Sequence, residues 1–316
     1  KIINEMADYL NIAQMKKLQE VLIKNLSDAR PEKEQISNQE YLKMFIEAKQ
    51  IEGCSARTLQ YYQVTIEHLL KNIDTVIRKI TTDEIRTYLA EYQQRNNCSK
   101  VTVDNVRRNI SSFFSWLEEE DYILKSPMRR IHKIKTKQPV KEIISDEMIE
   151  RLRDNCRCSR DLAMIDLLYS TGIRVGELVG LNISDIDFEE RECVVYGKGD
   201  KERRVYFDAK AKLHLQNYIN SRTDTNPALF VTLDSPYERL KISGVEIRVR
   251  ELGRKLNIEK IHPHKFRRTM ATRAIDKGMP IEQVQKILGH SQIGTTMQYA
   301  IVNQNNVKTS HRRYIA

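Results

Sequence analysis

Six side chains with the chemistry to handle a phosphate group lie in four short clusters of the chain's second half. They are two arginines, a lysine, two histidines and a final tyrosine, namely Arg174, Lys198, His264, Arg267, His290 and Tyr299. Arginine forks two hydrogen bonds onto one phosphate, and lysine acts as a mobile point cation. A tyrosine hydroxyl is a weak nucleophile at neutral pH, but neighbouring cations lower the cost of ionising it. These residue types could together bind a phosphate group and stabilise negative charge that develops on it, without a metal.

The first cluster, TGIRVGEL, places an arginine where helices usually prefer acidic residues. A glycine ends one helix, so that Arg174 lies in the first turn of the next helix, with Glu177 three residues on and on the same side. We interpret an arginine at this disfavoured position as a phosphate ligand. The alternative is a surface arginine that pairs with Glu177.

The second cluster, GKGDKERR, predicts a lysine at the tip of a flexible turn. Lys198 lies between two glycines, and its ammonium could swing toward an oxygen. A nucleotide-binding loop is excluded, because the pattern G-x-x-x-x-G-K-[ST] and its strand–loop–helix context are missing. Taken alone, this cluster would be an ordinary basic turn.

The third and fourth clusters, HPHKFRRT and LGHSQIGTTMQY, contribute two histidines, an arginine and the tyrosine. A proline sets the backbone angle just before a helix. On that helix His264 and Arg267 share a face one turn apart, where they could bind two oxygens of one phosphate. For His264 considered alone, a helix-capping ring is the favoured interpretation. His290 follows a glycine at a helix break, and a helix over about 291–302 would present Tyr299.

In order and spacing, these clusters resemble the conserved boxes of the tyrosine recombinase, or phage integrase, family. The matching segments are TGIRVGEL, GKGDKERRV, HPHKFRRTMAT and LGHSQIGTTMQY, and the resemblance covers about residues 37–303. Because several independent boxes agree, the match is far more specific than any one motif. The resemblance implies a helical, SAM-like core-binding domain followed by a catalytic domain of the tyrosine recombinase type.

The resemblance also implies a role for each matching cation. Arg174 and Arg267 would hold the scissile phosphate of DNA. Glu177 matches the acidic position that steadies the first of these arginines. Lys198 would protonate the 5′-oxygen that leaves.

Two histidines and the tyrosine complete the implied site. His264 would assist proton handling, His290 would hydrogen-bond a phosphate oxygen, and Tyr299 would be the nucleophile. Attack gives a 3′-phosphotyrosine and keeps the energy of the cut bond, so that resealing needs no ATP. A competing tyrosine, Tyr314 in HRRYIA, also lies near basic residues but has no such boxed partners.

The elements that must position these residues are mainly α-helical. Glycine and proline are sparse, at 11 and 7, and apolar residues recur at helical spacing. A helix is predicted over 1–28 and a break at 29–36. Four helices with serine or threonine caps then form a small bundle over 37–126.

The second domain is predicted to be mostly helical with a small antiparallel sheet. The β-rich runs CVVY and RRVYF flank a glycine-containing turn, which predicts a hairpin within 186–207. Helices are expected at about 146–155, 160–170, 174–179, 209–220, 243–256, 264–277, 280–288 and 291–302. The predicted organisation is an N-terminal helix and linker at 1–36, a core-binding domain at 37–126, an interdomain linker at 127–144, a catalytic domain at 145–303 and a tail at 304–316.

The segment SPMRRIHKIKTKQPVK joins the two domains and contains six basic residues and no acid. Charge repulsion and proline argue against packing, so we expect a linker. It would be either a solvated tether or, as we favour, a strap along DNA phosphates through Arg129, Arg130, Lys133, Lys135 and Lys137.

Further DNA contacts are expected from the helical bundle and from one departure in the third box. The bundle has cations at helix starts or faces suited to phosphate contact, or alternatively only to solvation: Arg57, Lys100, Arg107 and Arg108. The chain has Phe266 and Arg268 where the family usually has leucine and histidine. We expect altered packing there, or an added backbone contact to DNA from Arg268.

Composition agrees with a DNA-binding protein without itself establishing one. The net charge is +10, and the excess of basic residues is spread over both halves. No apolar run long enough for a membrane span is present, and five cysteines without a C-x-x-C predict reduced thiols in a cytoplasmic protein. No D-x-D type acidic cluster lies within the boxes, so we expect no metal or other cofactor and disfavour a two-metal nuclease.

The leading prediction is a site-specific DNA recombinase that integrates, excises or inverts a DNA segment, as on a mobile element. Its partners would be double-stranded DNA at specific sites, three further copies in a homo-tetramer on two sites, and accessory DNA-bending proteins. The main alternative is a type IB topoisomerase, which shares the tyrosine chemistry but exchanges no strands. A DNA-binding regulator with a dead site is disfavoured, because every catalytic position is filled.

Overall fold

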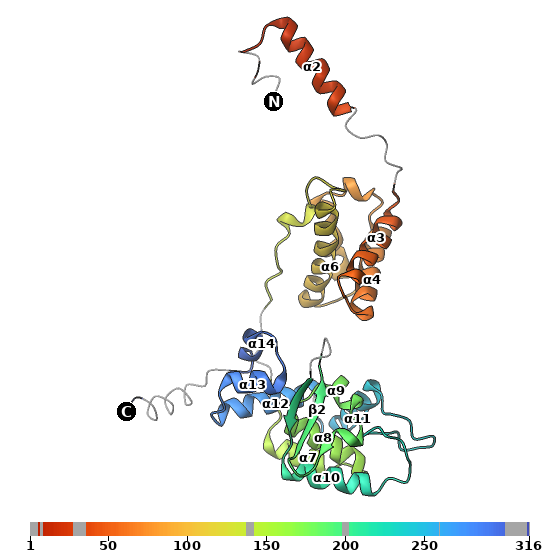
Figure 1. The fold of residues 1–316 in the computed structure, drawn as a ribbon, viewed down its shortest axis with the longest axis vertical. Helices are drawn as coiled ribbons and strands as arrows, with labels where there is room; N and C mark the ends of the chain where they lie inside the picture. The colour runs from red at the N-terminus through yellow and green to blue at the C-terminus, as the bar shows by residue number, and fades with distance from the viewer. Residues whose placement is uncertain are drawn as a thin grey trace. The chain divides into compact units, whose positions relative to one another are not determined.

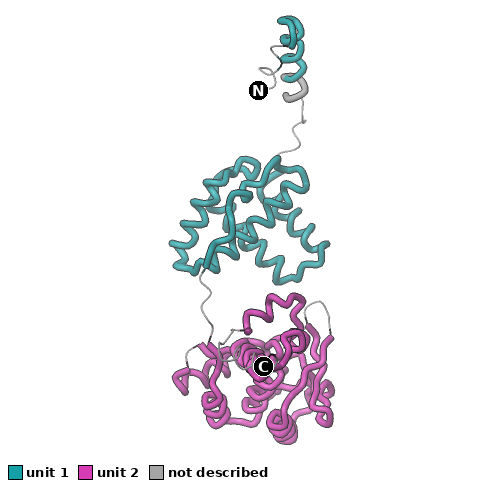
Figure 2. The backbone as a smooth tube through the Cα atoms, turned by 90° about the vertical axis from the view of Figure 1, so that its left-hand side faces the viewer, with its two compact units in different colours: residues 1–139 teal, residues 140–316 magenta. Residues whose placement is uncertain are grey.

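The computed structural model describes residues 6, 9–27, 36–136, 142–197, 202–258, 260–300 and 315. The chain divides into two compact units, residues 1–139 and 140–316, shown in teal and magenta in Figure 2. Both are built mainly of helices, and the second contains a small antiparallel sheet (Figure 1). Within the described ranges, no helix combines the length and apolar character needed to cross a bilayer.

The N-terminal helix is shorter than its apolar pattern predicted. Helix α2 spans Ile12–Ser27, rather than 1–28, and residues 1–5, 7–8 and 28 lie outside the described residues. Asn11 accepts a hydrogen bond from the Gln14 amide, and the Gln14 side chain accepts one from the Asn11 amide. This reciprocal cap satisfies amide donors at that end, so the helix begins just after Asn11.

The four helices predicted for the core-binding bundle are confirmed. Their bounds are α3 (Asn38–Ile51), α4 (Ala56–Asn72), α5 (Thr82–Arg95) and α6 (Lys100–Glu119), with a short 3₁₀ turn η1 (Ile77–Lys79). Each helix is capped by a hydroxyl that accepts a backbone amide, from Ser37, Ser55, Thr81 and Ser99. Phe45 and Phe113 pack edge to face in the core, with ring centroids 5.2 Å apart.

The basic segment expected to be a linker from residue 127 instead begins as part of the first unit. Pro127–Arg130 form the 3₁₀ turn η2, in which Met128 is buried, and Ile131 and Ile134 pack against the same core. The Ile134 amide also donates to the buried Asp104 carboxylate at 3.0 Å. Apolar side chains at every third position therefore outweigh charge repulsion as far as Ile134.

The far end of the predicted linker also packs, against the second unit. Ile144 is buried, and its amide donates to the Thr269 hydroxyl at 3.0 Å. Residues 137–141, including Lys137, lie outside the described residues. The boundary between the compact units falls at 139/140, inside the expected 127–144 interval but far from its start.

Helices of the second unit follow the predicted order. They are α7 (Asp146–Asp154), α8 (Ser159–Thr171), α9 (Val175–Gly180), α10 (Ala209–Asn220), α11 (Ile242–Lys255), α12 (Pro263–Asp276), α13 (Ile281–Leu288) and α14 (Ile293–Met297). Helix α8 is buried along most of its length, and α10 and α12 pack against it. This central helix supports the segments that carry the candidate site.

The predicted hairpin is confirmed, and a third strand extends it. Strands β2 (Glu192–Tyr196) and β3 (Glu202–Tyr206) pair antiparallel, with Cys193 opposite Val205. The short strand β1 (Ile186–Asp187), preceded by the 3₁₀ turn η3 (Ile183–Asp185), pairs with the other edge of β2. Cys193, Val195 and Val205 point into the core, so the alternation of the hairpin sets which side chains face inward.

Candidate active site

The first predicted arginine lies at a reversal between two helices. Helix α8 ends at Gly172, whose φ of 63° is left-handed and favours glycine, and Arg174 is the N-cap residue of α9. The Arg174 amide donates to Glu177 Oε2 at 2.7 Å, and its guanidinium donates to Glu177 Oε1 at 2.8 Å. Glu177 therefore caps helix α9 and orients the Arg174 side chain at the same time. The pairing of Arg174 with Glu177 that the sequence offered is present.

The Glu177 carboxylate is buried yet ionised. Burial raises its pKa, but hydrogen bonds from Arg203 and from Arg174 outweigh burial and leave the pKa below its usual value. A buried anion between two guanidinium groups keeps both cations in fixed positions. A second guanidinium nitrogen of Arg174, Nη2, makes a longer hydrogen bond, of 3.4 Å, to the Gly289 carbonyl.

The second predicted arginine, Arg267, is almost completely enclosed, with 1% of its surface exposed. From α12 its guanidinium donates to the Gly172 carbonyl at 2.7 Å and to the Leu288 carbonyl at 2.6 Å. Its buried Nε has no hydrogen-bond partner among the described residues. Burial and then the charge of Arg174 lower the pKa of Arg267 to about 10, which leaves it cationic at neutral pH.

His290 is aimed at Arg267 from a left-handed glycine turn. Gly289, with a φ of 63°, ends α13, and His290 Nε2 lies 3.0 Å from Arg267 Nη2. A guanidinium can only donate, so Nε2 accepts and the ring proton is on Nδ1, which donates to Thr296 Oγ1 at 2.9 Å. Burial and then the charge of Arg267 lower the pKa of His290 to about 4, so the ring is neutral at pH 7.

Tyr299 lies beside this pair in the same chain. Its ring stacks on His290 with centroids 6.1 Å apart and planes at 24°, and it packs in a small apolar cluster with Ala271, Val284 and Leu288. Helix α14 ends at Met297, not near 302, because the turn closes with Tyr299 N–H donating to the Thr296 carbonyl at 2.9 Å. Tyr299 is therefore presented by a turn after a short helix, and residues beyond Ala300 lie outside the described residues except Ile315.

The structure brings together four of the six predicted side chains directly, namely Arg174, Arg267, His290 and Tyr299. His264 is exposed in the first turn of α12, where its ring stacks on His262 at 6.5 Å, and its charge acts on His290. Lys198 lies outside the described residues, between the ends of β2 and β3. Arg268 is partly exposed and makes a long 3.5 Å contact to the Glu142 carbonyl.

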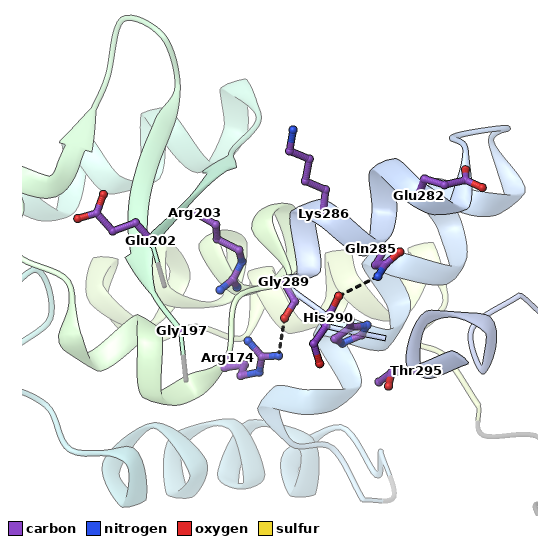
Figure 3. Close-up of a pocket in the computed structure, with 11 residues that line it drawn as sticks. Arg174, Gly197, Glu202, Arg203, Glu282, Gln285, Lys286, Gly289, His290 and Thr295 are labelled. Carbon is purple, nitrogen blue, oxygen red and sulfur yellow. Dashed lines mark hydrogen bonds between the residues drawn. The ribbon is translucent and has the colours of Figure 1, made fainter. Parts of the chain in front are cut away.

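A cavity of about 650 Å³ opens beside these residues, as Figure 3 shows. Arg174, Arg203, Gly289 and His290 line it from the α9 start, strand β3 and the end of α13. Arg174 and Arg203 point toward the same region in this view, and a dashed line joins Arg174 to the Gly289 carbonyl. The arrangement is a recess with cationic walls next to a stacked tyrosine, which suits a phosphate diester.

Two residues of the site were missed by sequence reasoning. Arg203 forks onto both Glu177 oxygens, and Thr296 fixes the tautomer of His290. Strand alternation offered a signal for Arg203, because an inward Val205 implies an inward residue two positions earlier. Nothing local marks Thr296, whose role depends on a turn that returns it to the histidine.

The cations expected to touch DNA from the first unit differ in availability. Arg57 and Lys100 are exposed in the first turns of α4 and α6, and the described linker cations Arg129, Arg130, Lys133 and Lys135 are exposed, although Arg129 pairs with Glu118. Arg108 is exposed while also reaching Asp104. The expectation for Arg107 does not fit its position, because its side chain is 12% exposed and donates to Asp104 at 2.8 Å.

The neutral state of the half-buried His290 ring predicts a pH-dependent stability. Between pH 6.5 and 4 the unfolded chain binds a proton at this ring that the folded chain does not, so acidification destabilises the fold. We expect His290→Gln to lose less stability than the wild type between pH 7 and 5, by about 1 kcal/mol, which is roughly half of what the full pKa difference would give, because solvent screens the exposed part of the ring. Urea unfolding at both pH values measures the difference. His132→Gln, which replaces an exposed ring in the first unit, serves as the control, and equal losses in His290→Gln and wild type would contradict the assignment.

A helical bundle followed by a helical domain that sets a tyrosine beside two buried or half-buried arginines and a histidine defines a tyrosine recombinase. The chain belongs to the phage integrase family: the model of the "Phage integrase family" matches residues 141–306, and that of the "Phage integrase, N-terminal SAM-like domain" matches residues 41–124. The predicted family, fold class and recombinase activity are thereby confirmed.

Curated relatives extend over most of the chain. A protein named tyrosine recombinase XerC from Leptospira interrogans is 31% identical over 296 residues, which cover 90% of this chain and 95% of that protein. Another of the same name, from Oceanobacillus iheyensis, is 29% identical over 293 residues, covering 86% and 95%. The chain is thus similar to these recombinases through both of its units.

Solved structures share the fold at low sequence identity. The Tn1549 transposon integrase in complex with a circular intermediate DNA has a TM-score of 0.72 at 19% identity, covering 86% of this chain and 98% of that chain. A lambda integrase dimer bound to a core site has a TM-score of 0.68 at 18% identity, covering 90% and 85%.

Proposed function

We propose that this recombinase cuts one DNA strand at a time through Tyr299 and reseals it to a new partner. The Tyr299 oxygen forms a bond to the scissile phosphorus while the bond to the 5′-oxygen breaks, which gives a 3′-phosphotyrosine. A 5′-hydroxyl of another strand then reverses the step and releases the tyrosine. The number of phosphoester bonds is conserved, so neither ATP nor an external co-reactant is consumed.

The observation that carries the proposal is the direct chain of contacts from Arg267 through His290 to Tyr299. Arg267 and Arg174 would neutralise the non-bridging oxygens as charge develops on them. Tyr299 belongs to the chain that contributes these cations, so we propose that cleavage occurs in cis.

Protons are handled by the remaining predicted residues. Lys198 would donate the proton that the leaving 5′-oxygen needs, and His264, on the exposed start of α12, would assist. His290 is neutral in the described state, but an arriving phosphate anion raises its pKa and favours a ring that donates from both nitrogens. Thr296 then keeps the ring oriented throughout.

The DNA partner is proposed to be a duplex held by both units. Phosphate contacts would come from the exposed cations Arg57, Lys100, Arg108, Arg130, Lys133, Lys135 and, in the second unit, Arg268. Lys137 and the tail at 304–316 remain predictions outside the described residues. We propose a tetramer on two sites in the cytoplasm, acting on a mobile element with or without accessory DNA-bending proteins.

A paired assay separates recombination from the topoisomerase alternative. Trapping the full chain on a library of nicked suicide substrates and sequencing the attached DNA would identify its site. A plasmid with two such sites should then yield recombined products, whereas relaxation of a one-site plasmid without strand exchange would favour the topoisomerase. Failure to capture any DNA covalently would refute both activities.

A further inference from the structure

The sequence suggested no role for Arg203 beyond that of a basic residue in the hairpin segment, but its side chain makes several polar contacts beside the recess. It is the second residue of β3, and its side chain is 11% exposed. Nη1 and Nη2 donate to Glu177 Oε1 and Oε2 at 2.8 and 2.7 Å, and Nε donates to the Ile287 carbonyl at 2.8 Å. A planar guanidinium satisfies this fork, whereas a lysine ammonium cannot.

These contacts join three segments that are far apart in the sequence. The first segment is strand β3, which contains Arg203 itself. The second is the start of α9, where Glu177 pairs with Arg174, and the third is the end of α13, where the Ile287 carbonyl lies just before the Gly289–His290 turn. Arg203 also lies against that turn, because a Cβ on Gly289 would be 2.9 Å from Arg203 Cδ. A single side chain therefore sets the separation of the hairpin, the first arginine and the histidine.

The shared carboxylate shows how Arg203 would influence Arg174. Glu177 is buried, and without Arg203 its charge would be balanced mainly by Arg174, drawing that guanidinium inward and weakening it as a phosphate ligand. With Arg203 on both oxygens, Arg174 contributes only Nη1 to the pair. Its other guanidinium nitrogen then remains oriented toward the recess.

We propose that Arg203 is a positioning residue for strand cleavage, which holds Glu177 and the end of α13 so that Arg174 and His290 meet the scissile phosphate correctly. This inference rests on the proposed function. Arg203 need not touch DNA itself. Its loss should therefore slow the chemical step and leave DNA affinity nearly unchanged.

The test compares Arg203→Gln and Arg203→Lys with Arg204→Gln in the full chain. Arg204 is a matched control, since it is the next residue on the same strand, is 67% exposed and pairs with Glu192 away from the recess. We expect Arg203→Gln to lower the single-turnover cleavage rate of a suicide substrate by about 10- to 100-fold. Arg203→Lys should restore only part of that rate, and Arg204→Gln should match the wild type. Gel-shift affinities should agree within about twofold across the set.

A pH profile supplies a signature that a general loss of packing would not produce. Arg203 provides the foremost hydrogen bond that lowers the pKa of Glu177, so its replacement should raise that pKa and add a loss of rate on the acidic side. The added loss should disappear in the double variant Arg203→Gln/Glu177→Gln. Melting curves establish that each variant is folded.

Failure of the positioning role can be distinguished from failure of the proposed function. If the wild-type chain forms no adduct, the proposed function fails. If it does, and Arg203→Gln cleaves within twofold of it across the pH range, or loses rate only in proportion to affinity, the positioning role is wrong. Should Arg203→Gln not fold, the comparison of Arg203→Lys with Arg204→Lys decides, and equal rates overturn the inference.

Discussion

Tyr299→Phe should abolish covalent capture of DNA while leaving duplex binding intact. The substitution removes only the phenolic oxygen, and the ring can keep its stacking on His290 and its contacts with Ala271, Val284 and Leu288. Loss of the proposed nucleophile should reduce adduct formation on a nicked suicide substrate by at least about a thousandfold. Adducts are counted on denaturing gels, and affinity is measured by gel shift on the same DNA.

Tyr314→Phe is the control for this substitution, because Tyr314 is the competing tyrosine near basic residues. It should form adducts at the wild-type rate. Persistent adducts in Tyr299→Phe, together with their loss in Tyr314→Phe, would transfer the nucleophile to the other tyrosine. The contacts described for Tyr299 would then be structural only.

Arg267→Lys should lower the cleavage rate by about 10²- to 10³-fold, the range observed when one preorganised donor to a developing anion is removed. The lysine keeps a positive charge but cannot reach the Gly172 carbonyl, the Leu288 carbonyl and His290 together in one plane. Each buried carbonyl left without a donor also costs about 1–3 kcal/mol, so thermal stability should fall as well. Single-turnover cleavage and melting curves measure the two effects separately.

Arg268→Lys is the matched control, since Arg268 is the next residue on α12 and makes only a long contact to the Glu142 carbonyl. It should cleave a bound substrate at a nearly normal rate and affect mainly affinity and its salt dependence. Wild-type cleavage by a folded Arg267→Lys would show that the fork geometry is unimportant, and the phosphate-binding assignment of Arg267 would fail.

Much of the candidate site could be predicted from the sequence, because several of its interacting residues lie only a few positions apart in the chain. Arg174 and Glu177 lie three residues apart, and the structure joins them in one cap. Gly172 and Gly289 both adopt the left-handed backbone that permits the reversals before Arg174 and His290. The starts of the bundle helices could also be predicted from short segments, because the hydroxyl that caps each helix lies directly before it in the sequence.

Other features depended on neighbours that no local pattern identifies. The basic segment after Ser126 was expected to stay free, but Met128, Ile131 and Ile134 find apolar partners in the bundle core. Arg107 was expected to face DNA, but its guanidinium forms an ion pair with the buried carboxylate of Asp104. In both cases packing against distant residues outweighed the local charge pattern.

By itself, the sequence determined the reactive groups, their order along the chain and the mainly helical fold class. It also determined the glycine turns that precede Arg174 and His290. Only the tertiary structure decided that Arg203 shares Glu177 with Arg174, that Thr296 sets the His290 tautomer, and that Tyr299 follows α14 rather than lying within it. The physical reason is that hydrogen bonds and burial between segments dozens of residues apart depend on how helices pack, whereas caps and glycine turns depend on adjacent residues.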